Sequence, residues 1–482
     1  MYTPTLEQVK TLAQKGNLIP VYREINADLE TPVAAYLKIA RGRYSFFLES
    51  VEGGERQARY SFLGTEPRRV LITGPGTKTG AVDPLSIVEQ ELSKYRYVPA
   101  PGLPRFLGGA IGYLAYETVH YAEPRVPVPD ANPQGVPEAV LMFTDTLLVF
   151  DHLRHTIKIV SHVHTDGDVE QAYEEAVGRI ERLAARLAGP MPRRALRNGP
   201  ANGKGEAVSN VAPEQYHDIV RRCREYIIAG DIIQVVPSRR VARPTSATPF
   251  NIYRALRALN PSPYMYFLHL GDFHIIGASP EALVRVEDGM VYTFPLAGTR
   301  ARGATPEQDE ALALELRADE KERAEHIMLV DLGRNDLGRI CQPGSVQATD
   351  IMRVVRYSHV MHLESEIRGK LRPDRTMFDA LRSCLPAGTL AGAPKIRAME
   401  IIAEVERERR GPYGGAVGYF GFQGNMDVAI PIRTILLRKG VAYVQAGGGI
   451  VYDSIPEAEH QETVNKAAAP LRAVQQAEEY AT

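Results

Sequence analysis

The order of the apolar segments is the sequence feature that most constrains the fold. Runs typical of β-strands come close together, as in hairpins, and segments typical of amphipathic helices form groups of their own. A chain of alternating strand–helix–strand units would intersperse the two kinds one by one. The sequence therefore predicts an α+β protein rather than an alternating α/β protein.

The clearest break in the pattern is the segment GPMPRRALRNGPANGKGEAVSN, which is rich in Gly, Pro, Asn and Arg and has no periodicity. Such composition is typical of a linker or loop. A chain of 482 residues is long enough for two or three domains. We therefore predict a first domain over 1–188, a linker or loop over 189–211 and a second domain over 212–482.

Composition excludes several classes of protein. With 57 basic and 58 acidic residues, nothing suggests a nucleic-acid partner. Three widely spaced cysteines form no CxxC pair, so neither a disulfide framework nor a zinc site is expected. The first residues lack the apolar core of a secretory signal, and no apolar run reaches the about 18 residues that span a bilayer. The expected location is the cytoplasm, away from membranes.

Two segments predicted to be helical carry pairs of acids. Glu322 and Glu325 share a helix face with two leucines, and Glu459 and Glu462 are spaced in the same way, with Lys466 one turn further on. Such pairs are often solvated surface residues. If they are buried, each carboxylate raises the pKa of its neighbour unless a cation compensates. Carboxylate oxygens suit Mg²⁺, which also bridges to anionic substrates.

Other segments offer groups for a small anion. The loop over 383–402 is either a tight turn or a substrate loop that places the Thr389 hydroxyl, and its spacing is not that of a P-loop. Arg433, in the apolar run VAIPIRTILL, needs a carboxylate from the protein or from a substrate. The glycines at 447–449 offer backbone N–H groups, and His362 is either structural or an acid–base group. Together these features predict an enzyme that acts on a small anion with Mg²⁺.

One short stretch occurs twice. GGAIGY at 108–113 is echoed by GGAVGY at 414–419. Close packing of two strands explains both copies, and a distant duplication is the alternative.

Three long motifs carry a resemblance to a known family. ADEKERAEHIMLVDLGRNDLGR, LPAGTLAGAPKIRAMEII and GGGIVYDSIPEAEHQETVNKA resemble, in that order, motifs of the chorismate-utilising enzymes. The resemblance covers about 212–470, and FFLES and RYSFLG extend it towards the N-terminus. It implies a four-layer α/β/β/α sandwich, with a chorismate-binding catalytic domain at 212–482 and a feedback region in the domain at 1–188.

The resemblance also implies roles for the acid pairs. Glu325 and Glu462 would bind Mg²⁺, with Glu322 and Glu459 behind them or acting through water. The metal would hold the ring carboxylate of chorismate. Pro470 departs from the family's usual pattern and should kink the last helix beyond its acid pair.

The remaining site residues are likewise carried over from the family. One group would bind the enolpyruvyl carboxylate, another would line the ring, Glu281 would help the C4 hydroxyl leave, and His362 would serve the pyruvate elimination. The carboxylate-binding residues are Tyr413, Arg433, Gly448 and Gly449, the ring-lining residues are Gly298, Thr299 and Thr389, and Lys466 is a further substrate-binding residue.

Two positions indicate which reaction of the family is expected. Gln234 stands where members that add water at C2 carry a lysine base, and Ala297 stands where aminodeoxychorismate synthases carry a lysine nucleophile. Both absences favour direct addition of ammonia at C2 and anthranilate as the product. The alternatives are an aminodeoxychorismate synthase component I, an Mg²⁺-dependent phosphate-ester enzyme and a non-catalytic amino-acid-binding regulator.

The source of the nitrogen is expected to lie outside this chain. Cys223 falls in a predicted helix, Cys341 follows one, and Cys384 lies in SCLPAG, so none resembles an amidotransferase nucleophile. We therefore expect a separate glutamine amidotransferase subunit in a hetero-oligomer.

Two further segments resemble the family's tryptophan feedback site. They are LES (Leu48, Glu49, Ser50) and NPSPYM, which contains Pro263, Tyr264 and Met265. Taken singly, the first is more often a strand end and the second a turn. Taken together they predict a pocket in which Glu49 pairs with the α-ammonium group of tryptophan and 263–265 flank the indole.

Overall fold

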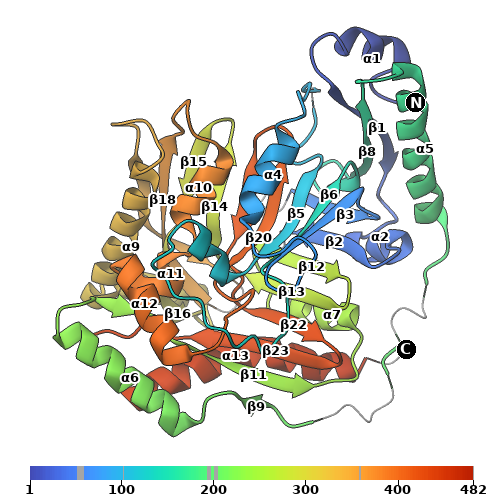
Figure 1. Ribbon diagram of the computed structural model, residues 1–482. Coiled ribbons are helices and arrows are strands. Elements are labelled where there is room, and N and C mark those ends of the chain that lie inside the picture. Colours follow the sequence, from blue (N-terminus) through green and yellow to red (C-terminus); the bar gives the residue numbers. More distant parts are fainter. Residues whose placement is uncertain (51–58, 101, 193–196, 200–204, 358–359, 481–482) are drawn as a thin grey trace.

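The computed structural model describes residues 1–482 except 51–58, 101, 193–196, 200–204, 358–359 and 481–482. The described residues form an 11-stranded and a 10-stranded antiparallel sheet that pack face to face, with helices on the outer faces (Figure 1). The predicted α+β class and the α/β/β/α layering are confirmed.

The 11-stranded sheet uses strands from both ends of the chain. Its order is β1 (Leu18–Asn26), β8 (Thr156–His164), β7 (Thr146–Asp151), β3 (Tyr60–Thr65), β2 (Tyr44–Glu49), β12 (Tyr264–Leu270), β13 (Phe273–Ser279), β22 (Thr434–Arg438), β23 (Val441–Gly447), β11 (Ser238–Pro244) and β9 (Val208–Ser209).

The 10-stranded sheet is also composite. Its order is β16 (Leu296–Ala301), β18 (Val360–Lys370), β15 (Met290–Thr293), β14 (Ala282–Glu287), β21 (Met426–Ala429), β20 (Ala416–Gly421), β5 (Gly109–Leu114), β6 (Ala139–Thr144) and β4 (Arg69–Thr73), and β17 (Gln347–Arg356) pairs with β18. A small ladder joins β10 (Gln234–Val235) to β19 (Gly392–Ala393).

Each sheet has its own helical layer. The apolar faces of α1 (Leu6–Leu12), α2 (Pro32–Ile39), α5 (Val169–Ala188), α7 (Pro249–Leu259) and α13 (Pro456–Glu478) share a core with the 11-stranded sheet. Those of α4 (Pro84–Leu92), α9 (Glu320–Gly338), α10 (Met377–Cys384) and α11 (Gly388–Ala391) share one with the 10-stranded sheet. The remaining helices are η1 (Tyr116–Tyr121), α6 (Pro213–Ile228), α8 (Pro306–Ala318) and α12 (Lys395–Glu406).

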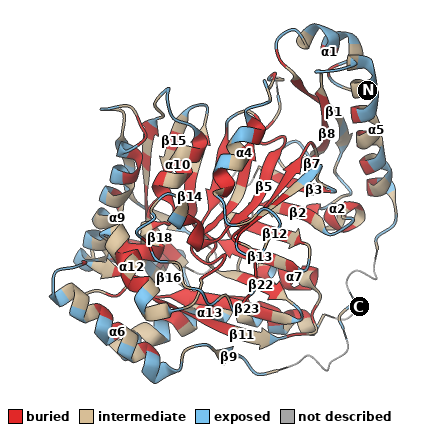
Figure 2. Cartoon of the chain, viewed as in Figure 1, coloured by how far each residue is buried: buried red, intermediate tan, exposed pale blue. Residues whose placement is uncertain are grey.

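A third core lies between the two sheets. Phe46, Tyr266 and Ile275 of the 11-stranded sheet meet Ile111 and Tyr419 of the 10-stranded sheet. Figure 2 shows the resulting band of buried residues through the middle of the molecule. Because strand residues alternate between faces, a residue that points into this middle core has neighbours that point towards the helices.

The two predicted domains share both sheets. Strand β2 pairs with β12 in the larger sheet, and β5 pairs with β20 in the smaller one. The division at 189–211 stays a prediction about the sequence; part of that segment lies outside the described residues, and the part at 208–209 forms β9 on β11. Within the described residues, no helix is both long and apolar enough to cross a membrane.

The two acid pairs lie on the helices α9 and α13, as predicted, and one detail differs. The run around Arg433 is not one strand: β21 ends at Ala429, β22 begins at Thr434, and Arg433 lies between them with a left-handed φ of 51°. The kink expected at Pro470 stays a prediction; Pro470 lies inside α13, which continues to Glu478. Pro at this position removes one backbone donor from the helix.

The smaller sheet explains why the glycine motif occurs twice. The two copies are the paired strands β5 and β20, and Gly112 lies directly opposite Gly418. A Cβ on Gly112 would come within 1.9 Å of the Val140 carbonyl oxygen, and a Cβ on Gly418 within 2.1 Å of the Asp427 carbonyl oxygen. Backbone atoms of neighbouring strands therefore occupy the space that a side chain would need.

We predict that Gly112→Ala destabilises the protein by about 1–3 kcal/mol, because the neighbouring backbone must move to admit the methyl group. The free energy of unfolding measured in urea checks this. Gly338→Ala is the matched control, since nothing lies within 4 Å of a Cβ at that helical position. Equal stability of the two variants would contradict the steric argument.

Candidate functional site

The predicted site residues gather where the ends of several strands meet α9, α11 and α13. Glu281 lies between β13 and β14, His362 in β18, Thr389 in α11 and Lys466 in α13. Elements from 281 to 466 thus contribute to one region, which no local sequence pattern could show by itself.

Glu281 is a buried carboxyl group held by a hydroxyl. Its Oε1 accepts a hydrogen bond of 3.2 Å from Thr389 Oγ1. Burial raises the pKa of Glu281 to about 8, against the hydrogen bond from Thr389 and the positive charge of Lys466, which lower it. At neutral pH this group is therefore mostly protonated and able to donate a proton.

The hydrogen bonds of His362 determine which of its two ring nitrogens carries the hydrogen. Its Nδ1 lies 2.7 Å from the Gly298 carbonyl oxygen and 3.2 Å from Thr299 Oγ1. Since a carbonyl can only accept, Nδ1 carries the hydrogen and Nε2 of the neutral ring has the free lone pair. Burial lowers the pKa of His362, so the ring is neutral and can accept a proton at Nε2.

Arg433, Lys466 and Tyr413 lie close together and form a positively charged corner of the site with hydrogen-bond donors. Arg433 Nη1 donates to the Lys466 carbonyl oxygen at 3.3 Å, and Lys466 Nζ donates to the Gly447 carbonyl oxygen at 3.0 Å. A Cβ on Gly447 would lie 2.9 Å from the Tyr413 hydroxyl, so that phenol faces the same corner. Burial lowers the pKa of Arg433, as expected for a cation without a fully matched anion.

The glycines at 447–449 differ in part from the expectation of free backbone donors. The expectation is wrong for Gly448, whose N–H donates to the Pro237 carbonyl oxygen at 3.3 Å. The glycines instead leave room for side chains: a Cβ on Gly448 would lie 3.0 Å from Glu459 Oε2, and one on Gly449 would lie 2.6 Å from Gln234 Nε2. Gln234 is thus brought against Gly449.

The acid pair on α9 lies beside the ring-lining loop. A Cβ on Gly298 would lie 3.2 Å from Glu322 Oε2, and Arg300 Nη1 lies 3.4 Å from Glu322 Oε1. Burial raises the pKa of Glu325, and the charges of Glu322 and Glu462 raise it further. The acids of the two helices are therefore close enough to repel one another.

The acid pair on α13 is partly satisfied. Glu459 Oε1 accepts a hydrogen bond of 2.7 Å from Ser454 Oγ, while its buried Oε2 has no hydrogen-bond partner in the described part of the chain. Glu462 pairs with Lys466 Nζ at 2.6 Å. Among the described residues, no three His, Cys, Asp or Glu side chains are arranged to hold a metal ion. The donor set fits Mg²⁺ chemically, because a cation would relieve the repulsion and use the unpaired oxygen.

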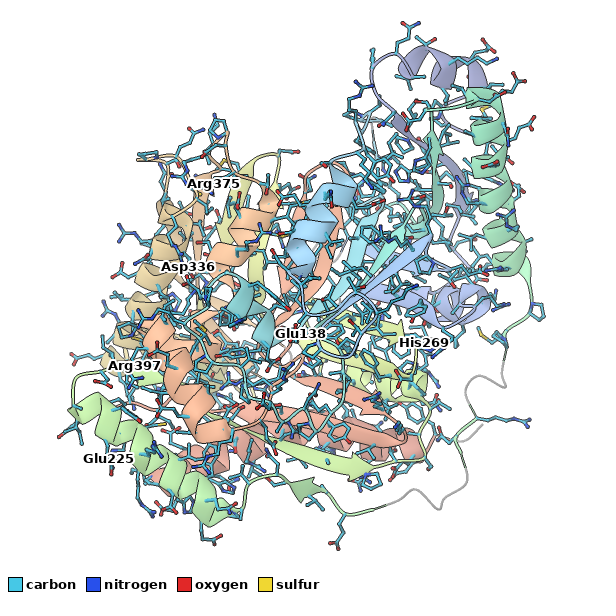
Figure 3. The ribbon with its side chains drawn as sticks, in the orientation of Figure 1. Glu138, Glu225, His269, Asp336, Arg375 and Arg397 are labelled. Carbon is cyan, nitrogen blue, oxygen red and sulfur yellow. The ribbon has the colours of Figure 1, made fainter. Side chains whose placement is uncertain are left out.

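The leucines that share a face with the α9 acids line a cavity of about 410 Å³ next to Glu281 and Thr389. Leu329 and Leu332 form part of its wall, and Asp336, labelled on α9 in Figure 3, lies at the same cavity. The mixed face of α9 is therefore explained by its neighbours. The leucines lie at the cavity, Glu322 lies beside β16, and Glu325 lies near Glu462 of α13.

A second cavity, of about 690 Å³, lies between the two sheets. All six residues predicted for the tryptophan site line it: Leu48, Glu49, Ser50, Pro263, Tyr264 and Met265. Sequence reasoning did not foresee the far wall, which comes from the 10-stranded sheet and includes Arg285, Tyr419 and Asp427.

Glu49, which is expected to pair with the α-ammonium group of tryptophan, already binds side chains of α7. Its carboxylate accepts hydrogen bonds from Arg257 at 2.6 and 3.2 Å and from the Tyr253 hydroxyl at 2.5 Å, all from α7. Asp427 is the other carboxylate in the cavity wall, and it accepts from the Tyr264 hydroxyl at 3.0 Å. A ligand's ammonium group would therefore have to share Glu49 with α7.

Comparison with known proteins places this arrangement in a family. The model of the chorismate binding enzymes matches residues 44–472. The chain belongs to this family, as the motifs predicted.

The full-length relatives narrow the assignment. The chain is 48% identical to anthranilate synthase component 1 of Acetivibrio thermocellus, covering 99% of this chain and 100% of that protein. It is 49% identical to the Pseudomonas putida protein of that name, covering 98% and 99%. The crystal structure of anthranilate synthase component I from Streptococcus pneumoniae has a TM-score of 0.77 at 38% identity and covers 92% of this chain and 98% of that one. The chain is thus a lyase of the anthranilate synthase component 1 type.

Proposed function

We propose that this chain binds Mg²⁺ and converts chorismate and ammonia to anthranilate and pyruvate in tryptophan biosynthesis in the cytoplasm. The observation that carries this proposal is that the site region contains a buried, protonated Glu281 bonded to Thr389 and a buried, neutral His362 bonded to Gly298. The two groups supply an acid for one step and a base for the next.

The first step is amination. Ammonia adds at C2, the ring double bonds shift, and the C4 hydroxyl leaves as water with the proton of Glu281. Gln234 suits this step because ammonia, unlike water, needs no base to become a nucleophile, and Ala297 forms no covalent adduct with C2.

The second step is elimination. His362 Nε2 takes the C2 proton as the ring becomes aromatic, and the enolpyruvyl group leaves as pyruvate once its methylene carbon has gained a proton. The hydrogen bond from Nδ1 to Gly298 orients the ring for this transfer.

The remaining residues hold the substrate. Tyr413, Arg433, Lys466 and the backbone at Gly449 bind the enolpyruvyl carboxylate, and Gly298, Thr299 and Thr389 line the ring. Glu325 and Glu462, with Glu322 and Glu459 behind them, would hold Mg²⁺, and the ion would supply positive charge for the ring carboxylate.

The test of this function is product identification. The purified chain is given chorismate, Mg²⁺ and ammonium, and the products are separated by chromatography. Anthranilate with an equal amount of pyruvate is expected. Aminodeoxychorismate would establish the alternative reaction, and recovery of unchanged chorismate would refute both.

The nitrogen donor in the cell is proposed to be a separate glutamine amidotransferase subunit. In this chain the three cysteines are buried, and burial raises their pKa values, which disfavours the thiolate that a glutaminase needs. The two subunits together would use glutamine, whereas this chain alone would use ammonia.

We predict that activity requires Mg²⁺ and that Glu325→Gln or Glu462→Gln lowers it about 100-fold at a fixed Mg²⁺ concentration, because each change removes a charged ligand while keeping its shape. Anthranilate fluorescence measured against Mg²⁺ concentration checks this. Glu457→Gln, an exposed acid on the same helix, is the control and should leave the Mg²⁺ dependence unchanged. Full turnover of either variant in EDTA would disprove the metal role.

We predict that kcat/KM falls as pH rises through about 8, because Glu281 then loses the proton that it must donate. Rates are compared at a constant concentration of uncharged ammonia. Thr389→Val removes a hydrogen bond that favours the charged carboxylate and so raises the pKa of Glu281. The falling limb of the pH profile, where kcat/KM decreases, should therefore move to higher pH. Glu281→Gln should abolish the limb, and a limb that persists in this variant would assign it to another group.

We further propose that tryptophan binds in the cavity between the sheets and inhibits the enzyme. A ligand there touches both sheets, and a ligand that binds two states with different affinity shifts their populations. Tyr264 and Tyr419 offer aromatic surfaces for an indole.

We predict that Ser50→Phe fills this cavity and leaves an active enzyme that tryptophan does not inhibit. Calorimetry and inhibition curves on the wild type and the variant check this. By linkage, chorismate should weaken tryptophan binding by the same factor by which tryptophan weakens chorismate binding. Binding of tryptophan that chorismate leaves unchanged would rule out the regulatory role.

A further inference from the structure

Arg410 is an arginine in an unusual position. It lies in the loop between α12 and β20, and only 1% of its surface is exposed, which makes it one of the largest fully buried side chains of the described residues. A buried guanidinium is costly unless its charge and its donors are all matched. Its surroundings therefore show what it is matched to.

The charge is matched by Glu406, the last residue of α12. Arg410 Nε lies 2.9 Å from Glu406 Oε2, and Nη2 lies 2.5 Å from Oε1. Glu406 Oε1 also accepts hydrogen bonds from Ser238 N at 2.7 Å and Ser238 Oγ at 3.0 Å. The pair is thus tied to the beginning of β11.

The remaining donors reach two different segments of the proposed chorismate site. Nη1 donates to the Leu390 carbonyl oxygen at 2.7 Å, and Nη2 donates to the Val236 carbonyl oxygen at 2.6 Å. Leu390 follows Thr389, which bonds to Glu281, and Val236 lies two residues after Gln234. One rigid fork therefore spans both segments.

The faces of the guanidinium are also used. Its central carbon lies 4.6 Å from the ring centre of Tyr116 and 5.6 Å from that of Tyr413. Such cation–π contacts orient the rings as well as stabilise the cation. Tyr413 thus belongs to a third segment of the site that Arg410 contacts, after those of Leu390 and Val236.

The backbone of Arg410 is fixed by the N-terminal part of the chain. Its N–H donates to Glu117 Oε1 at 2.6 Å, and Gly411 N–H donates to Glu117 Oε2 at 3.2 Å. The preceding residue, Arg409, pairs at 2.9 Å with Glu138, which is labelled near the centre of Figure 3. The backbone from which the guanidinium extends is therefore held in place, as are the acceptors that it reaches.

We infer that Arg410 is a positioning residue for the chorismate reaction: its guanidinium holds the segments of Gln234, Thr389 and Tyr413 at fixed distances from one another. The inference rests on the proposed function. Arg410 touches no reacting atom in this scheme; it acts through the two backbone carbonyls and the phenol ring. Stability alone does not account for it, since a buried ion pair adds little net stability over well-packed apolar residues.

The test is Arg410→Lys in the full chain. An ammonium group can pair with Glu406, but it cannot span the Leu390 and Val236 carbonyls as a planar fork does. Misplacement of substrate-contacting groups by about 1 Å lowers rates about 100-fold, so we expect kcat/KM for chorismate to fall by about that factor while circular dichroism stays unchanged. The Tm should fall by a few degrees, because two buried carbonyl oxygens lose their donors, which is too little to account for the loss of activity. The fall in kcat/KM should lie mainly in kcat.

Arg243→Lys is the matched control. Arg243 also pairs with a buried acid, Glu478 at 3.1 Å, but this pair joins β11 to the end of α13. We expect the control to keep the wild-type kcat/KM. If Arg410→Lys stays within about threefold of the wild type, or if both variants lose activity in proportion to their loss of Tm, the inference is overturned.

A second variant guards against misfolding. Arg410→Ala leaves a space that adjoins a cavity of about 300 Å³ lined by Tyr116, Glu117 and Glu406. Free guanidinium chloride at millimolar concentration should then restore part of kcat, and methylammonium should not. Restoration by both cations, or by neither in a folded variant, counts against the inference.

The same experiments separate this inference from the proposed function. Loss of activity in Glu281→Gln with full activity in Arg410→Lys would refute the positioning role alone. Failure of the wild type to form anthranilate would refute the proposed function, and the inference with it.

Discussion

The antiparallel pairing of distant strands is the constraint on which the rest of the structure depends. The ladders β2–β12 and β5–β20 join residues more than 200 positions apart into two continuous sheets. The core between the sheets then fixes their spacing. Both the candidate site and the second cavity are built on strands whose positions these ladders set.

The candidate site shows how burial changes the chemistry of common groups. In water, a glutamic acid and a histidine are both charged between about pH 4.5 and 6.5. Burial raises the pKa of Glu281 and lowers the pKa of His362, so both groups favour their neutral forms here. Nearby, the charges of Glu322 on α9 and Glu462 on α13 raise the pKa of Glu325. Clustered charges with shifted pKa values are more frequent at functional sites than elsewhere.

The sequence predicted the fold class and much of the candidate site because the signals are local. Glu322 and Glu325 beside leucines, or Glu459, Glu462 and Lys466 at helical spacing, are visible in one window of residues. The family motifs then supplied Glu281 and His362, whose partners Thr389 and Gly298 lie far away in the chain.

Other features could not be foreseen because they depend on contacts between distant segments. The engagement of Glu49 by α7 follows from the alternation of side chains along β2 and from which helix covers that face. The Gly448 N–H is used by Pro237, which belongs to another segment. Arg410 gave no sequence signal beyond a basic pair before a glycine, since its importance lies in three segments that meet only in the folded chain.

The shared sheets also determine how this chain can be divided. A cut between α5 and β9 would interrupt neither of these two elements, and proteins ordinarily tolerate cuts at such places. Here each fragment would carry unpaired edges, β2 and β5 on one and β12 and β20 on the other. Exposed edges of this kind recruit strands from other molecules. The two fragments would therefore have to be made together, each serving as the folding template of the other.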